Sequence, residues 1–132
     1  MSLLLDLTLD IPLPPGPNGR NGLLRMHWAK MKAIKAQLKE TLEEALSQAE
    51  SVPDNLSEPV VIEYTRYRRA GPPMDKDNAY SSTKIVTDLL VKLGVLENDV
   101  PKIVTDIVVN QEQDYFKPTR LGIKIWSEVP EA

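Results

Sequence analysis

The chain has 132 residues, enough for one domain with a single hydrophobic core, and its 42% hydrophobic and 27% charged residues are ordinary for a soluble globular protein. It contains no cysteine, which excludes disulfides, thiolate catalysis and cysteine–zinc sites, and its single histidine excludes a histidine metal cluster. The apolar start Leu3-Leu4-Leu5 is interrupted by Asp6 and lacks a basic leader, so we expect neither a signal peptide nor a membrane span, and the cytoplasm is the expected compartment.

The distribution of charge says more than its sum. The net charge of −3 and the pI near 5.2 argue against nucleic acid as a partner. Between Asp10 and Glu40, however, there is no acid, and a second basic group lies further along the chain. Such segments can follow a phosphate backbone, although lysines of this kind can equally form the solvated face of a helix. The basic residues concerned are Arg20, Arg25, Lys30, Lys32, Lys35 and Lys39, then Arg66, Arg68 and Arg69.

The first half of the chain predicts a strand, a loop and a helix. Apolar residues alternate with polar ones from Leu5 to Ile11, the period of a half-buried strand. Residues 12–22 are too rich in proline and glycine for regular structure and form either a ligand-binding loop or a long turn. From His27 to Ala49 the apolar residues recur at helical spacing, so this helix should pack on the sheet, with Trp28 as an anchor at the core or its rim.

The second half predicts a strand, a helix and two further strands. The β-branched and aromatic run Val60–Tyr67 is typical of a strand. A helix follows the motif at 74–78 and should end near Leu93-Gly94, where glycine is the expected stop. The final strands are expected at Ile103–Val109 and Leu121–Trp126. The predicted fold is therefore a single α+β domain over residues 1–132, in the order β-α-β-α-β-β, with a small mixed sheet packed by two main helices.

The stretch Met74-Asp75-Lys76-Asp77-Asn78 carries the chemistry. Two carboxylates one residue apart before a helix, and a third, Asp99, beyond its far end, are the kind of oxygen ligands that magnesium accepts. On a helical wheel Ser81, Lys84 and Asp88 fall within about 40° of Asp77, opposite an apolar face. A lysine there can stabilise the extra negative charge on a phosphate in a transition state.

Plainer interpretations stand beside this one. An aspartate at a helix start is often a cap that accepts backbone N–H bonds. Lys84 and Asp88 are an i,i+4 pair and could be a surface ion pair alone. A calcium-binding EF-hand is excluded, because a loop starting at Asp75 would place Tyr80 where glycine is required and Val86 where the bidentate glutamate belongs.

The pattern Asp75-x-Asp77-Asn78, then Lys84-x-x-x-Asp88-x-Leu90, Gly94 and Asn98-Asp99, resembles the RusA family of Holliday junction resolvases, common in prophages. The resemblance implies a homodimeric, magnesium-dependent endonuclease, with manganese as a possible substitute, that makes paired cuts in four-way DNA junctions during recombination and repair. It implies that Asp75, Asp77 and Asp99 are metal ligands and that Lys84 is the catalytic lysine. The expected DNA contacts are Asn18, Arg20, Arg25, Lys30, Arg66, Arg68 and Arg69.

The sequence departs from that family in two ways. The family lysine commonly follows the Asp-Asn pair sooner, whereas here residues 79–83 intervene and Ser81 stands one turn after Asp77. Lys84 aligns only if about one helical turn has been inserted. The acidic net charge is the second departure. Two alternatives therefore stay open: a junction-binding protein that does not cleave, and a nuclease that acts on other branched DNA.

Overall fold

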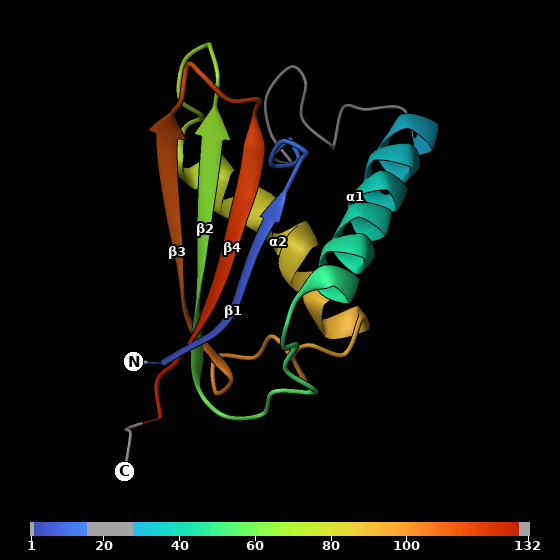
Figure 1. Ribbon diagram of the computed structural model, residues 1–132, viewed down its shortest axis with the longest axis vertical. Helices are drawn as coiled ribbons and strands as arrows, with labels where there is room; N and C mark the ends of the chain where they lie inside the picture. Colours follow the sequence, from blue (N-terminus) through green and yellow to red (C-terminus); the bar gives the residue numbers. More distant parts are fainter. Residues whose placement is uncertain (1, 16–27, 130–132) are drawn as a thin grey trace.

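The computed structural model describes residues 2–15 and 28–129. Their elements confirm the predicted order and the small mixed sheet with two helices (Figure 1). The strands and helices are β1 (Ser2–Leu9), α1 (Trp28–Gln48), β2 (Val60–Arg68), α2 (Lys76–Lys92), β3 (Val104–Gln113) and β4 (Arg120–Ser127). Within these residues no helix is both long and apolar enough to cross a membrane.

The sheet has the strand order β1-β4-β2-β3. β4 pairs antiparallel with both β1 and β2, whereas β2 pairs parallel with β3. Parallel neighbours cannot be joined by a tight turn, so the chain must cross over between them, and α2 forms that crossover. As a result α2 begins next to the end of β2 and passes close to β3, one of the two edge strands of the sheet (Figure 1).

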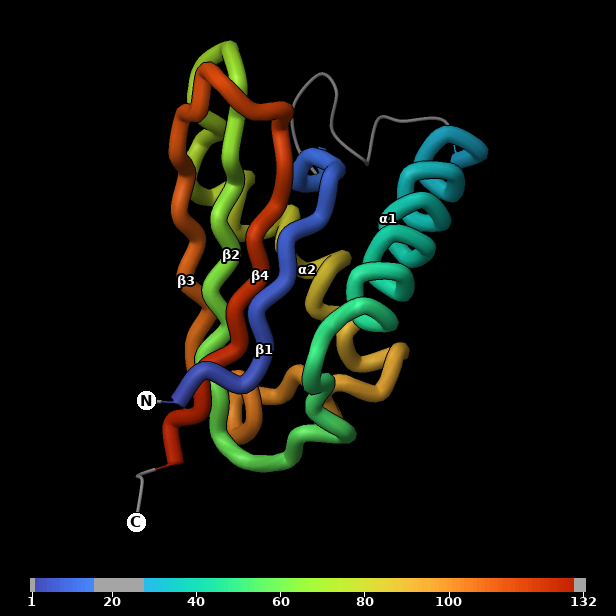
Figure 2. The backbone as a smooth tube through the Cα atoms, viewed as in Figure 1, coloured from blue at the N-terminus to red at the C-terminus, as the bar shows by residue number. Residues whose placement is uncertain are grey.

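Both helices pack on one face of the sheet (Figure 2). The alternation predicted for the first strand is observed, since Leu5, Leu7 and Leu9 are buried. Leu38 and Leu42, one turn apart, are the buried residues of α1. The other large, fully buried apolar side chains of the core come from the central strands, from α2 and from the segment after it: Val60, Ile62, Tyr64, Val86, Leu90, Leu96, Leu121, Ile123 and Ile125.

Three details differ from the sequence-based expectations. Asp77 lies inside the first turn of α2 instead of before the helix. β3 continues to Gln113, because its polar residues keep pairing with β2 as far as Arg68. Trp28 is 66% exposed, so it is not part of the buried core. The predicted end of α2 is correct: the Leu93 N–H bonds the carbonyl of Leu89, and Gly94 follows with a φ of 81°, a conformation that glycine adopts without strain.

Candidate active site

Asp75 is the N-cap of α2. The backbone N–H of Asp77 donates to Asp75 Oδ1 at 2.9 Å, which satisfies one of the free donors at a helix start. Asp77 follows in the first turn, where its charge complements the helix dipole. Both residues are exposed. The capping interpretation of Asp75 is therefore confirmed, and one of its two carboxylate oxygens is engaged.

Gln111 ties the start of α2 to the sheet edge. Its Oε1 accepts from the Met74 N–H at 2.8 Å, and its Nε2 donates to the Met74 carbonyl at 2.8 Å. The same Oε1 accepts from Arg66 Nη1 at 3.2 Å. One amide on β3 thus holds the residue before Asp75 and orients a half-buried arginine of β2. Burial, together with the charge of Arg68, lowers the pKa of Arg66.

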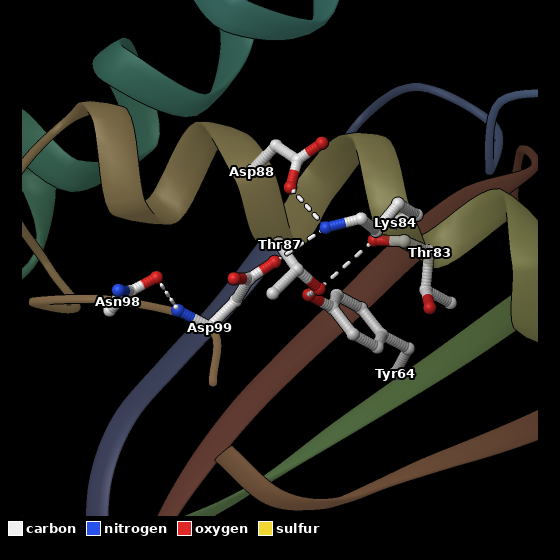
Figure 3. Close-up of polar contacts among 7 residues, drawn as sticks. All are labelled: Tyr64, Thr83, Lys84, Thr87, Asp88, Asn98 and Asp99. Atoms are coloured by element: carbon white, nitrogen blue, oxygen red, sulfur yellow. Dashed lines mark hydrogen bonds and ion pairs between the residues drawn. The ribbon is translucent and has the colours of Figure 1, made fainter. Parts of the chain in front are cut away.

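Lys84 lies between two carboxylates on the exposed side of α2 (Figure 3). Its ammonium donates to Asp88 Oδ1 at 2.8 Å and to Asp99 Oδ2 at 2.5 Å. Asp88 is one turn further along the helix, but Asp99 comes from the segment that folds back after α2. Within that segment the Asp99 N–H donates to the side-chain oxygen of the neighbouring Asn98 at 2.8 Å. The structure therefore brings together the predicted lysine and one of the three predicted acidic ligands.

The charges in this cluster stabilise one another. The hydrogen bonds from Lys84 to Asp88 and then Asp99 raise the lysine pKa above its ordinary value. The bond from Lys84 is also the main reason why the pKa of Asp99 lies below its ordinary value. The Lys84 side chain is 64% exposed and that of Asp99 is 29% exposed, so solvent screens the pairs and each adds about 1 kcal/mol or less to stability. The main effect of these ion pairs is to fix the positions of the charged groups of Lys84, Asp88 and Asp99.

These pKa shifts predict a measurable coupling. Asp99, with its depressed pKa, stabilises the fold above its unfolded pKa, and this contribution is lost as the pH falls through the folded value. Lys84, with its raised pKa, stabilises the fold below its unfolded pKa, and this contribution is lost as the pH rises through the folded value.

In Lys84→Met the pKa of Asp99 should return upward, measured by NMR titration of the carboxyl carbon. Lys92→Met, at the last turn of α2, should leave it unchanged; equal titration of Asp99 in Lys84→Met and the native protein would contradict the pairing.

A buried hydroxyl pair supports the turn of α2 that carries Lys84 (Figure 3). Thr87 Oγ1 donates to the Thr83 carbonyl at 3.0 Å, so the Tyr64 hydroxyl is the donor in its 2.7 Å bond to Thr87 Oγ1. Burial raises the pKa of Tyr64, which therefore stays protonated and able to donate. Sequence reasoning missed this support, because no local pattern links a strand tyrosine to a threonine 23 residues later.

Removing the Tyr64 hydroxyl tests that support. Tyr64→Phe is expected to lower the free energy of unfolding by about 1 kcal/mol, because one buried hydrogen bond is lost while Thr87 keeps its bond to Thr83. Denaturant unfolding measures the change. Tyr115→Phe, at a tyrosine that is 67% exposed, is the matched control and should have no effect. An unchanged midpoint for Tyr64→Phe would show that the bond contributes nothing.

Two pockets lie between α2 and β3. One, of about 380 Å³, is lined by Tyr80, Ser81, Thr83, Lys84, Thr87, Asp99 and Ile107. The other, of about 550 Å³, is lined by Lys76, Asp77, Ala79, Tyr80, Val109 and Gln111. Tyr80 lines both, so Asp77 and the Lys84–Asp99 pair face neighbouring hollows on the same side of the molecule. Pockets of this size suit small ligands or part of a larger one.

The predicted metal ligands are only partly assembled. Across residues 2–15 and 28–129 there is no group of three or more acidic or histidine side chains placed to hold a metal ion. Asp75 caps the helix, Asp77 lines the second pocket, and the acid that shares Lys84 with Asp99 is Asp88. Asp88 and Asp99 nevertheless meet at one ammonium, so their two carboxylates form a local site that attracts positive charge.

Asn78 adds an unexplained polar group beside these acids. In the described part of the chain its Oδ1 is the buried side-chain oxygen without a hydrogen-bond partner. Leaving such an atom unpaired costs about 1–3 kcal/mol. Water or a ligand could satisfy it, and amide oxygens belong to the donor set that hard cations accept. The residues around Asp77 thus fit magnesium in chemical type, although their carboxylates do not converge.

The basic residues expected to contact DNA lie on different elements. Lys30 is exposed on the first turn of α1, and Arg69 is exposed just after β2. Arg66 and Arg68 are half-buried on β2, where Arg68 Nε donates to the Gly71 carbonyl at 3.1 Å. The expected contacts Asn18, Arg20 and Arg25 lie outside the described residues. The arginines of β2 therefore lead directly into the segment that carries Asp75 and Asp77.

Comparison with known proteins adds no identification. No protein-family model matches the sequence, and no curated protein matches it significantly.

Proposed function

We propose that this protein is a magnesium-dependent endonuclease that cuts branched DNA, with the four-way junction as its substrate. The observation that carries the proposal is the meeting of Lys84 and Asp99, which come from opposite ends of a fold-back and line a pocket next to that of Asp77. A positioned cation next to carboxylates, open to solvent, is suited to binding and cleaving a phosphodiester.

Lys84 has the properties of a group that stabilises charge. Its raised pKa keeps the ammonium protonated throughout the physiological range. It is exposed, and its position is defined by Asp88 and Asp99, so it can meet a phosphate oxygen with little loss of side-chain freedom. The bond from Tyr64 to Thr87 holds the turn of α2 from which it projects.

The acids would hold the metal. We assign Asp77 and Asp99 to the metal. Asp75 lies two residues before Asp77, and its second carboxylate oxygen is a further ligand. A bound magnesium ion would polarise the phosphate and lower the pKa of the attacking water. Gln111 matters here because it holds Met74, and therefore the Asp75–Asp77 turn, against β3.

Branched DNA as the substrate follows from charge and symmetry. Arg66, Arg68 and Arg69 precede the acidic segment, and Lys30 adds a positive charge on α1. A four-way junction has two equivalent strands to cut, so a homodimer with two sites related by twofold symmetry would match it. A nuclease for flaps or other branches would use the same residues, and a panel of substrates distinguishes the two.

A second candidate is a junction-binding protein that does not cleave. One observation favours it: Lys84 is paired with both Asp88 and Asp99, and the described acids do not form a three-ligand group. In that protein the cluster would be a surface ion-pair network.

The test uses a labelled synthetic four-way junction, a flap and a matched linear duplex, each with magnesium, manganese or EDTA. Metal-dependent paired nicks in the junction, lost in Asp77→Asn, are expected from the proposal. Junction binding without nicks in either metal would support the second candidate. If the protein neither binds nor cuts any branched substrate, both candidates are wrong.

A further inference from the structure

The turn between β3 and β4 presents two aromatic side chains to solvent. Tyr115 is 67% exposed and Phe116 is 95% exposed, the highest value among the large hydrophobic side chains of the described residues. Single exposed apolar residues are common, but adjacent aromatic rings on a projecting turn form a contact surface that the fold itself does not use. We refer to residues 114–117 as the aromatic turn.

The aromatic turn is held by specific bonds. Asp114 anchors it: its N–H donates to the Arg68 carbonyl at 2.9 Å, and its Oδ1 accepts from the Phe116 N–H at 3.1 Å. Its Oδ2 accepts from Arg120 Nη2 at 3.1 Å, and the Arg120 guanidinium lies 4.0 Å from the centre of the Tyr67 ring. The two exposed rings therefore start from an ordered backbone, which reduces the entropy lost when they bind a partner.

The aromatic turn lies beside the segment that leads into the candidate active site. The chain between β2 and α2 and the turn between β3 and β4 are neighbours at one end of the sheet (Figure 2). Besides the bond from Asp114 to Arg68, the Arg69 N–H donates to Thr119 Oγ1 at 3.4 Å. The segment that runs from this end of the sheet to Asp75 is short. Its Met74 is hydrogen-bonded to Gln111 of β3, the strand that leads into the aromatic turn.

The charges around the aromatic turn favour an anionic partner. Arg68, Arg69 and Lys117 contribute positive charge at this end of the sheet. The acid of the turn, Asp114, is paired with Arg120, which leaves Glu112 as the opposing charge on the last part of β3. Aromatic rings between cations are the usual composition of a surface that stacks bases and binds the adjoining phosphates.

We propose that the aromatic turn stacks on the bases exposed where stacking is interrupted at the branch point of DNA, with Phe116 as the principal ring and Arg68, Arg69 and Lys117 beside the phosphates. This inference rests on the proposed function, and it assigns branch recognition to a segment separate from the acids and Lys84. Bases at a branch point can be unstacked at lower cost than bases within a duplex, so an inserted ring favours the branch.

The experiment compares binding of a four-way junction and a matched duplex, with 2-aminopurine at the branch point, in calcium without magnesium. Phe116→Leu keeps an apolar side chain but removes the aromatic ring, and Phe116→Trp restores one. Phe116→Leu is expected to weaken junction binding about 5- to 100-fold and to reduce the 2-aminopurine response. It should leave duplex binding unchanged, while Phe116→Trp should bind the junction as the native protein does. Val52→Ala, at an exposed apolar residue in the segment between α1 and β2, is the control.

Each contrary outcome is distinct. Native junction affinity and fluorescence in Phe116→Leu would overturn the inference while leaving the proposed nuclease intact. Equal weakening on junction and duplex would overturn branch recognition. Loss of a dimer by Phe116→Leu without DNA, seen by sedimentation, would show that the aromatic turn is an interface between copies of the chain. Failure of the native protein to bind either DNA would overturn the inference and the proposed function together.

Discussion

Replacing Asp99 with asparagine is expected to reduce the rate of junction cleavage by about 10²- to 10³-fold, the size of effect that follows when an active site loses one group that stabilises the transition state. The substitution keeps the size of the side chain but removes the negative charge next to Lys84. Junction binding should be retained or become tighter, because the surface loses a negative charge. Single-turnover cleavage in magnesium and binding in calcium measure the two effects separately.

The control for Asp99→Asn is Asp54→Asn, which removes an exposed carboxylate from the segment between α1 and β2. It should leave cleavage and binding unchanged. Both variants should unfold within about 1 kcal/mol of the native protein, because exposed ion pairs add little stability. If Asp99→Asn cleaves within about threefold of the native rate, Asp99 takes no part in catalysis and its bond to Lys84 is only a surface ion pair.

Replacing Lys84 with methionine is expected to reduce the maximal cleavage rate about 100-fold or more, since a positive charge that stabilises the transition state is lost. The same substitution leaves Asp88 and Asp99 facing one another without the ammonium between them. The magnesium concentration that gives half the maximal rate should therefore fall severalfold. A lower rate together with a lower magnesium requirement would be the signature of a lysine that both assists catalysis and neutralises the acids.

Two further variants make the Lys84 result specific. Lys84→Arg keeps the positive charge and should recover part of the rate, although the planar guanidinium binds carboxylates and phosphates with a different geometry. Lys92→Met removes an exposed lysine from the end of the same helix and should behave as the native protein. If Lys84→Met cleaves at the native rate with an unchanged magnesium requirement, Lys84 serves only as an ion-pair partner.

Local patterns predicted most of the fold and one part of the site. Alternation from Leu5 to Leu9 and helical spacing through Val86 and Leu90 identified a strand and a helix, because each side chain's direction follows from the backbone period. The same period placed Lys84 and Asp88 on one face of α2, and their ion pair is observed. The glycine stop at Gly94 was predicted correctly for a similarly local reason.

Contacts between distant segments could be predicted only in part. The meeting of Lys84 with Asp99 agrees with the idea that the chain returns after α2. Spacing did not show, however, that the acids of the described residues form no group of three around a metal ion. No local pattern identified the aromatic turn, because nothing in its sequence shows that Asp114 binds the Arg68 carbonyl and the Arg120 side chain. Gln111 carries no motif at all, and its two bonds to Met74 exist only because β3 runs beside the start of α2.

The sequence by itself determined the α+β class, the order of the elements, the faces of the helices and the types of chemical group available, since these depend on composition and on periods of two and 3.6 residues. Only the tertiary structure decided which groups meet. Lys84 lies between Asp88 and Asp99, Asp75 caps a helix, and the aromatic turn stands beside the arginines of β2. These results depend on how the strands pair and how α2 crosses the sheet, and a contact between residues far apart in the chain is set by that packing as a whole.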